Sequence, residues 1–262
     1  MRFLRQMPAE STFPGDRFEP RMLCRLESAW AMAGRVPAGC GALPRHTHEV
    51  DQLYYVLSGT MQVRLGHDEV EATPGSLVYI PAGTPHENRN IGPAAELHLE
   101  ILAPAPPPFR PVYTLTDTCD GPAGYYVARG TAGQPGDREH WLTEPGTRSC
   151  AARVCAEQPG GDRPRMRIHE TDRLLFVLAG TLGVWAAGSR MTARRRTLAV
   201  LPAGVPHAVL SSGAEAARYL MLLLPTPTAG RDDPGRPAED VLDMTTADVR
   251  PGAGSPAARP AR

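Results

Sequence analysis

Apolar and polar residues alternate one by one in several short segments of the chain. Residues 61–65 and residues 96–101 both follow this pattern. Successive side chains of a strand point to opposite faces, so the alternation predicts half-buried β-strands. Two shorter apolar runs, residues 53–57 and 77–80, end close to Gly or Pro and also predict strands. Short strands separated by turns are typical of an all-β barrel or sandwich.

The same pattern occurs twice in the chain. The segment YYVLSG ends at Gly59 and recurs as LFVLAG ending at Gly180, while YIPAGTPH ends at His86 and recurs as VLPAGVPH ending at His207. Both pairs are offset by 121 residues, and the same offset aligns two further landmarks without an insertion. A repeat held at one offset indicates two copies of one module.

Composition shifts suggest where the modules end. A Pro-rich stretch at residues 104–111 follows the first copy. We therefore expect a metal-binding N-terminal module over residues 1–110 and a degenerate second module over residues 111–228. Residues 229–262 are rich in Pro, Ala and Arg and poor in apolar side chains, so we expect a disordered tail.

Charge and composition exclude several classes of protein. The chain has 28 basic residues, all of them Arg, and 28 acidic residues. This balance gives no reason to expect a nucleic-acid or membrane partner. The N-terminus lacks the apolar segment of a signal peptide, and five cysteines form no disulfide pattern. We expect a cytoplasmic monomer or homodimer that binds a small molecule.

Three histidines have the spacing of metal ligands. His46 and His48 are two positions apart, so on a strand both imidazoles would point to the same face. His86 follows the segment from Pro81 to Pro85, in which proline and glycine restrict the backbone. Converging imidazoles are the donors that a divalent transition metal prefers.

At these positions the sequence resembles the cupin superfamily. Its first motif appears here as His46, His48, Gln52 and Gly59, and its second motif is matched in full, at the residues Gly75, Pro81, Gly83, His86 and Asn90. The resemblance implies two tandem double-stranded β-helix (jelly-roll) barrels, a bicupin. It also implies one divalent metal held by His46, His48, His86 and Gln52, with Fe favoured over Mn, Ni or Zn.

Gln52 stands where the family usually has Glu. A glutamine can bind metal through its carbonyl oxygen, but it leaves the full +2 charge of the ion, which should favour an anionic ligand. Its alternative role is to hydrogen-bond a bound water. Tyr54 lies two residues further on the same predicted strand, so we name Gln52 and Tyr54 as the catalytic candidates.

The second module departs from the metal pattern. The 121-residue offset puts Arg167, His169, Arg173 and His207 at the four ligand positions. Guanidinium groups do not coordinate cations, so we expect no metal there. Either the arginines form an anion pocket with His169, or they face solvent and pair with nearby acidic residues.

Two polar residues of the segment 96–101, His98 and Glu100, could face either the outside or the interior of the barrel. Leu97, Leu99 and Ile101 are better suited to fill the barrel, which would leave His98 and Glu100 outside. The alternative is that the polar side of this strand faces the metal.

The resemblance favours a metalloenzyme that acts on a small oxygenated organic molecule. A dioxygenase of the quercetinase-like type, in bacterial secondary metabolism, is the first choice. A non-redox isomerase, cyclase or lyase is the alternative, and the absence of a carboxylate at position 52 tilts towards it. A non-catalytic small-molecule-binding cupin is the third reading.

Overall fold

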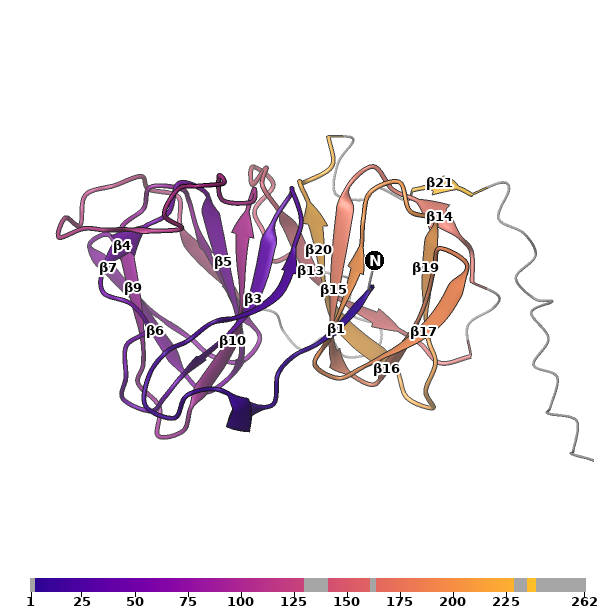
Figure 1. Cartoon of the computed structure of the whole chain (residues 1–262), viewed down its shortest axis with the longest axis horizontal. Helices are drawn as coiled ribbons and strands as arrows, with labels where there is room; N and C mark the ends of the chain where they lie inside the picture. Colours follow the sequence, from indigo (N-terminus) through magenta and orange to yellow (C-terminus); the bar gives the residue numbers. More distant parts are fainter. Residues whose placement is uncertain (1–2, 130–140, 161–163, 229–234, 239–262) are drawn as a thin grey trace, which may run out of the picture.

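The computed structural model describes residues 3–129, 141–160, 164–228 and 235–238. Within these ranges the chain forms 21 strands and one three-residue 3-10 helix, η1 (Glu10–Thr12). The strands form two barrels that lie side by side, the first on the left in Figure 1 and the second on the right. The all-β fold with two jelly-roll barrels is therefore confirmed.

The first barrel consists of two antiparallel sheets. Its inner sheet, which faces the second barrel, contains in spatial order β12 (Tyr126–Arg129), β8 (Ser76–Ile80), β5 (Asp51–Ser58), β10 (Glu96–Ala103), β3 (Trp30–Val36) and β2 (Arg21–Arg25). Its outer sheet contains β11 (Thr114–Leu115), β4 (His46–Thr47), β9 (His86–Asn90), β6 (Met61–Leu65) and β7 (Asp68–Ala72).

The second barrel repeats this plan. Its inner sheet contains β1 (Leu4–Gln6), β18 (Thr197–Leu201), β15 (Asp172–Ala179), β20 (Ala217–Leu224) and β13 (Ala151–Glu157). Its outer sheet contains β17 (Ser189–Arg194), β16 (Thr181–Ala186), β19 (His207–Ser211), β14 (Arg167–Ile168) and β21 (Arg236–Pro237). Strands that correspond at the 121-residue offset occupy corresponding places.

The largest hydrophobic core lies between the barrels. It combines apolar side chains from the two inner sheets, including Leu53, Tyr55, Leu99 and Ile101 of the first barrel and Leu174, Phe176, Leu220 and Leu222 of the second. Each barrel also has an interior core of its own, made by the residues of opposite parity on the same strands. Both faces of each inner sheet are therefore buried, so these strands carry apolar residues on two sides.

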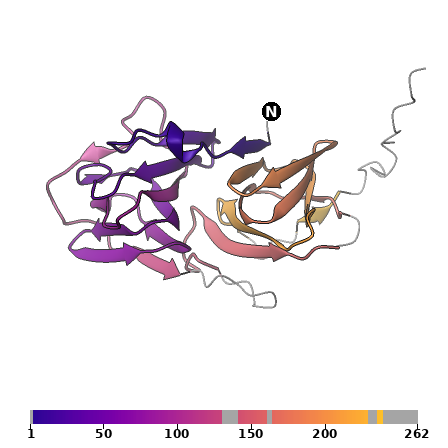
Figure 2. The same cartoon turned by 90° about the horizontal axis from the view of Figure 1, so that it is seen from below.

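The two barrels exchange an edge strand with each other. β1 precedes the first barrel but pairs with β18 of the second, with Leu4 opposite Ala199. β12 precedes the second barrel but pairs with β8 of the first, with Val127 opposite Val78. Figure 2 shows the indigo N-terminal strand reaching from the first barrel to the second. The two pairings are equivalent in the repeat, because Val78 and Ala199 are 121 residues apart.

Part of the predicted tail returns to the second barrel. β21 pairs with β14, with Ile168 opposite Arg236. The remaining positions of the 229–262 tail, residues 229–234 and 239–262, lie outside the described ranges, and so does the expectation that they are disordered. In the described part of the chain, no helix has the length and apolarity that would be needed to span a bilayer.

Candidate metal centre and its surroundings

The three histidines of the first barrel converge on one point. His46 lies on β4 directly opposite His86 on β9, and His48 follows β4. Candidate ligand atoms of the three side chains all lie within 4.8 Å of one another. The ring centroids are 4.3 Å apart for His46 and His86, 4.9 Å for His46 and His48, and 5.3 Å for His48 and His86. All three histidines are buried.

Backbone carbonyls hold one nitrogen of each histidine. Nδ1 of His46 is 2.8 Å from the Pro44 oxygen, Nδ1 of His48 is 2.7 Å from the Val112 oxygen, and Nδ1 of His86 is 2.9 Å from the Thr84 oxygen. A carbonyl can only accept, so Nδ1 carries the proton in each ring and Nε2 keeps its lone pair. Nε2 of His48 and Nε2 of His86 are buried without a hydrogen-bond partner. Such orphaned acceptors suit a cation.

All three histidines are neutral at pH 7. Burial lowers the pKa of His46, and it lowers the pKa of His48 to about 4, with the neighbouring His46 acting in the same direction. Burial, followed by the charges that His46 and His48 would carry, lowers the pKa of His86 well below its ordinary value. Metal ions compete with protons for imidazole nitrogen, so these shifts keep the three donors available to a metal.

Gln52 is on β5, inside the barrel, and is almost completely buried. Its Nε2 donates a 2.6 Å hydrogen bond to Oε1 of Glu100 on β10. Its Oε1 is buried without a hydrogen-bond partner, as are Nε2 of His48 and Nε2 of His86. The amide therefore presents an unused oxygen lone pair, while its nitrogen is committed to a carboxylate.

The expectation that His98 and Glu100 lie outside the barrel is wrong. Both are buried, at 0% and 7% exposure, and their strand points Leu97, Leu99 and Ile101 into the core between the barrels instead. The reason is that the second barrel covers the face that would otherwise meet water. The interior of the first barrel is consequently more polar than the apolar pattern of this strand indicated.

His98 forms a buried ion pair with the carboxylate two residues before it. Its Nδ1 is 2.8 Å from Oε2 of Glu96, and neither side chain is exposed. Burial alone would lower the pKa of His98, but the charges of Glu96 and Glu100 outweigh it and raise that pKa. The imidazole fits only because Gly34 lies opposite on β3: a Cβ at Gly34 would be 2.1 Å from Nε2 of His98.

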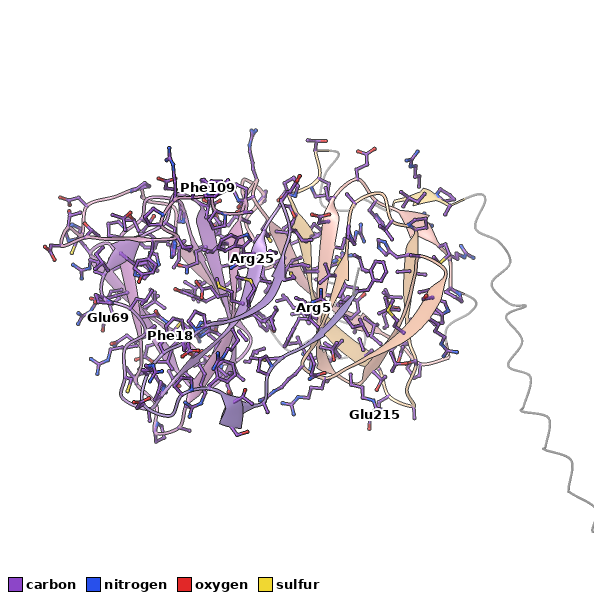
Figure 3. The ribbon with its side chains drawn as sticks, viewed as in Figure 1. Arg5, Phe18, Arg25, Glu69, Phe109 and Glu215 are labelled. Atoms are coloured by element: carbon purple, nitrogen blue, oxygen red, sulfur yellow. The ribbon has the colours of Figure 1, made fainter. Side chains whose placement is uncertain are left out.

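Aromatic rings enclose His98. Tyr54 lies edge-on to it, with ring centroids 5.1 Å apart, and Phe18 stacks over it at 6.1 Å. Phe18, labelled in Figure 3, belongs to the segment between η1 and β2. Tyr54 is 3% exposed, and burial followed by the charges of Glu100 and Glu96 raises its pKa well above the ordinary value. Tyr54 is thus a neutral phenol in the barrel interior.

The segment after the first module contributes to the histidine cluster. Tyr113 lies over it, with ring centroids 5.3 Å from His46 and 6.5 Å from His48, and it is partly exposed. The preceding residue, Val112, supplies the carbonyl that holds His48. No motif pointed to this segment. Glu49, which directly follows His48, lies at the surface in an ion pair with Arg110.

The corresponding positions of the second barrel also converge. Arg167 on β14 lies opposite His207 on β19, which reproduces the pairing of His46 with His86. The rings of His169 and His207 are 4.9 Å apart. Asp172, the acidic residue directly before Arg173, accepts hydrogen bonds from the Ser28 hydroxyl and the Ala203 amide with its two carboxylate oxygens.

Comparisons with known proteins agree with this architecture. A protein of Methanocaldococcus jannaschii described as uncharacterized is 34% identical over 74 residues, which are 28% of this chain and 57% of that protein. The chain therefore spans little more than half the length of this relative.

Among solved structures, the putative glyoxylate-induced protein of Pseudomonas aeruginosa matches with a TM-score of 0.63 and 18% identity, over 79% of this chain and 80% of that one. Lactobacillus farciminis oxalate decarboxylase, in a formate complex, matches with a TM-score of 0.62 and 14% identity, over 86% of each chain. At these identities the likeness concerns the fold. The sequence profile of the Cupin domain matches residues 34–101 and again residues 153–223, more than half of the chain, which therefore belongs to the cupin family as a two-barrel member.

Proposed function

We propose that the protein is a metal-dependent enzyme that acts on a small oxygenated organic molecule in the first barrel. The residues that would hold the metal are His46, His48, His86 and Gln52. The observation that carries this proposal is the set of buried lone pairs without partners, on Nε2 of His48, Nε2 of His86 and Oε1 of Gln52. Burial of unpaired polar atoms costs about 1–3 kcal/mol each, a cost that a bound cation would offset.

The donor set fits a divalent transition metal. Three neutral imidazoles and an amide oxygen suit Fe, Mn, Ni and Zn, and iron is our first choice. Bound there, the metal would polarise a carbonyl or enolate oxygen of the substrate and, if it is redox-active, could engage dioxygen.

Glu100 changes the electrostatics expected for this site. With four neutral donors the ion would keep its full charge, which favours an anionic substrate group. Glu100 places a carboxylate one hydrogen bond behind Gln52 and so offsets part of that charge. On balance the pKa of Glu100 is raised, because the effect of burial is larger than the opposing effects of the His98 charge and of the hydrogen bond from Gln52. The chain's own contribution is thus an amide oriented by a carboxylate that does not itself bind metal.

Elemental analysis of full-length protein purified without a chelating tag tests the metal site. We expect about one divalent metal per chain, and less than roughly 0.2 per chain in His48→Ala. His169→Ala is the matched control, because it removes the histidine at the equivalent position of the second barrel, and we expect unchanged metal content. A native protein that takes up no metal on reconstitution would instead be a non-catalytic binding cupin.

Dependence on oxygen tests the reaction class. A quercetinase-like dioxygenase is the first choice, and its turnover should stop when oxygen is removed from an assay of candidate enols and flavonols. The amide donor at Gln52 favours the second candidate, a non-redox isomerase, cyclase or lyase in which the metal acts as a Lewis acid. Equal turnover with and without oxygen would reject the dioxygenase and support this second candidate.

A further inference from the structure

The second barrel contains a cavity at the place where the first barrel has its histidine cluster. Its volume is about 320 Å³, within the range of small-molecule sites. Arg167, Arg173, His169 and His207, the four residues that replace the metal ligands, all line it. The second barrel therefore has a cavity at this position, but arginines stand at two of the four ligand positions.

The charged residues described in the lining of this cavity are mostly basic. Arg153 and Arg165 line it together with Arg167 and Arg173, whereas Glu157 is the one acidic residue among the described lining residues. The Tyr219 hydroxyl donates a 3.2 Å hydrogen bond to Glu157, and Arg153 stacks on Trp141 with its guanidinium carbon 4.8 Å from the ring centroid. Among the described lining residues, four guanidinium groups and one carboxylate favour an anionic ligand over a metal ion, since each guanidinium has several N–H donors and can bind a ligand besides its protein partner.

Part of the cavity wall is apolar. Leu175 and Met221, both buried, line it from β15 and β20, and Val209 lines it from β19. A ligand would therefore need carboxylate groups for the arginines and a short hydrocarbon chain for this wall, as in a short dicarboxylate. An inorganic oxyanion would satisfy only the arginines, because it would leave apolar surface in contact with water.

The returning tail segment contacts two of the residues that line this cavity. Gly235 has a positive φ of 64°, and a Cβ there would be 2.3 Å from Cε1 of His169, so no larger residue could lie this close. Nη1 of Arg167 donates a 3.0 Å hydrogen bond to the Gly235 oxygen, which fixes this side chain at the cavity. A guanidinium has five N–H donors, so Arg167 can hold Gly235 and still bind a ligand.

We propose that this cavity, lined by Arg153, Arg165, Arg167 and Arg173, is a second binding site that takes a small organic carboxylate. The carboxylate would accept hydrogen bonds from Arg167 and Arg173, since planar guanidinium groups bind carboxylates in a bidentate way. Its hydrocarbon part would contact Leu175 and Met221. The site is separate from the metal centre and needs no metal.

Isothermal titration calorimetry of the full-length chain tests this site with three probes: succinate, its neutral analogue succinamide, and inorganic phosphate. We expect one succinate per chain, no binding of succinamide, and weaker binding of phosphate. Arg167→Gln and Arg173→Gln should each weaken succinate binding about tenfold or more, because each removes a charged hydrogen-bond donor. Arg194→Gln, on exposed β17, is the matched control and should bind like the wild type.

Several results would overturn the proposal. Unchanged succinate affinity in both Arg167→Gln and Arg173→Gln would show that the anion binds elsewhere. Loss of succinate binding in His48→Ala, which leaves the second barrel untouched, would place the anion on the metal. Phosphate binding as tight as that of succinate would reject an organic ligand. Thermal unfolding of each variant identifies misfolding, and Arg167, half-buried on a two-residue strand, provides a test even if Arg173→Gln does not fold.

Discussion

Gln52 and Glu100 are joined by a 2.6 Å hydrogen bond between the amide nitrogen and a carboxylate oxygen, inside the first barrel. β5 and β10 are neighbours in the inner sheet, and this bond fixes which end of the amide points away from Glu100. A glutamine without that partner could present either end of its amide to the barrel interior. The Glu100 carboxylate therefore orients the amide so that its oxygen, and not its nitrogen, is available as a metal ligand.

Replacing Gln52 with Glu should destabilise the metal-free protein. The substitution removes the hydrogen bond and places a second buried carboxylate beside Glu100, which we expect to cost about 2–4 kcal/mol at neutral pH. A bound metal would neutralise part of this charge, so the metal should raise the melting temperature of Gln52→Glu more than that of the wild type. Thermal unfolding with and without the metal measures both effects, and an equal metal-induced shift in the two proteins would contradict the assignment of residue 52 as a ligand.

Metal-free protein should lose stability as the pH falls from about 6.5 towards 4. His48 binds a proton in the unfolded chain near its ordinary pKa of 6.5, but only near pH 4 when folded, because burial opposes its charge. The unfolded state thus binds more protons within this window, and the free energy of unfolding falls by about 3 kcal/mol from His48 alone. Urea unfolding of chelator-treated protein at several pH values measures the slope. His48→Gln should show a shallower slope, and an identical slope would contradict the prediction.

Restoring the ligand positions of the second barrel should create a second metal site. Arg167→His with Arg173→Gln recreates the donor set of the first barrel, because His169 and His207 are already present at the other two positions. The metal content of this double variant should rise from about one to about two per chain. Adding His169→Ala should bring it back to about one. Elemental analysis measures the change, and a double variant that remains at one metal would show that the second scaffold no longer fits an ion.

Gly34→Ala should disrupt the buried ion pair of the first barrel. The new methyl group would lie 2.1 Å from Nε2 of His98, so the imidazole would have to leave Glu96. Separating a buried charge pair and overpacking the interior should together cost about 3–5 kcal/mol. Gly146→Ala is the control, since a Cβ there meets no atom within 4 Å. Chemical unfolding compares the two, and equal stability would contradict the contact between Gly34 and His98.

The fold and the histidine cluster could be predicted because their signals are local or repeated. The spacing of His46 and His48, the rigid segment before His86 and the 121-residue repeat all survive in the linear sequence. The same motif drew attention to Gln52, which the structure buries inside the barrel.

The orientation of β10 could not be predicted in this way. Alternation shows that Leu97 and His98 lie on opposite faces, but it does not show which face is the interior. A second barrel packed against the sheet makes the apolar face an interface and turns Glu96, His98 and Glu100 inward. Only the packing of the two barrels against each other decides which face is the interior. The sequence therefore did not show that Glu100 contacts Gln52 or that His98 contacts Tyr54.

The exchange of β1 and β12 has a consequence for how the chain is made. The first barrel cannot close the β8 edge of its sheet until residue 129 has left the ribosome, and β1 has no partner until residue 201 has followed. An exposed edge strand readily pairs with a wrong neighbour, so β1 is exposed to this hazard for most of synthesis. Once residue 201 has been made, the single chain keeps the correct partner at high local concentration, an advantage that two separately translated barrels would lack.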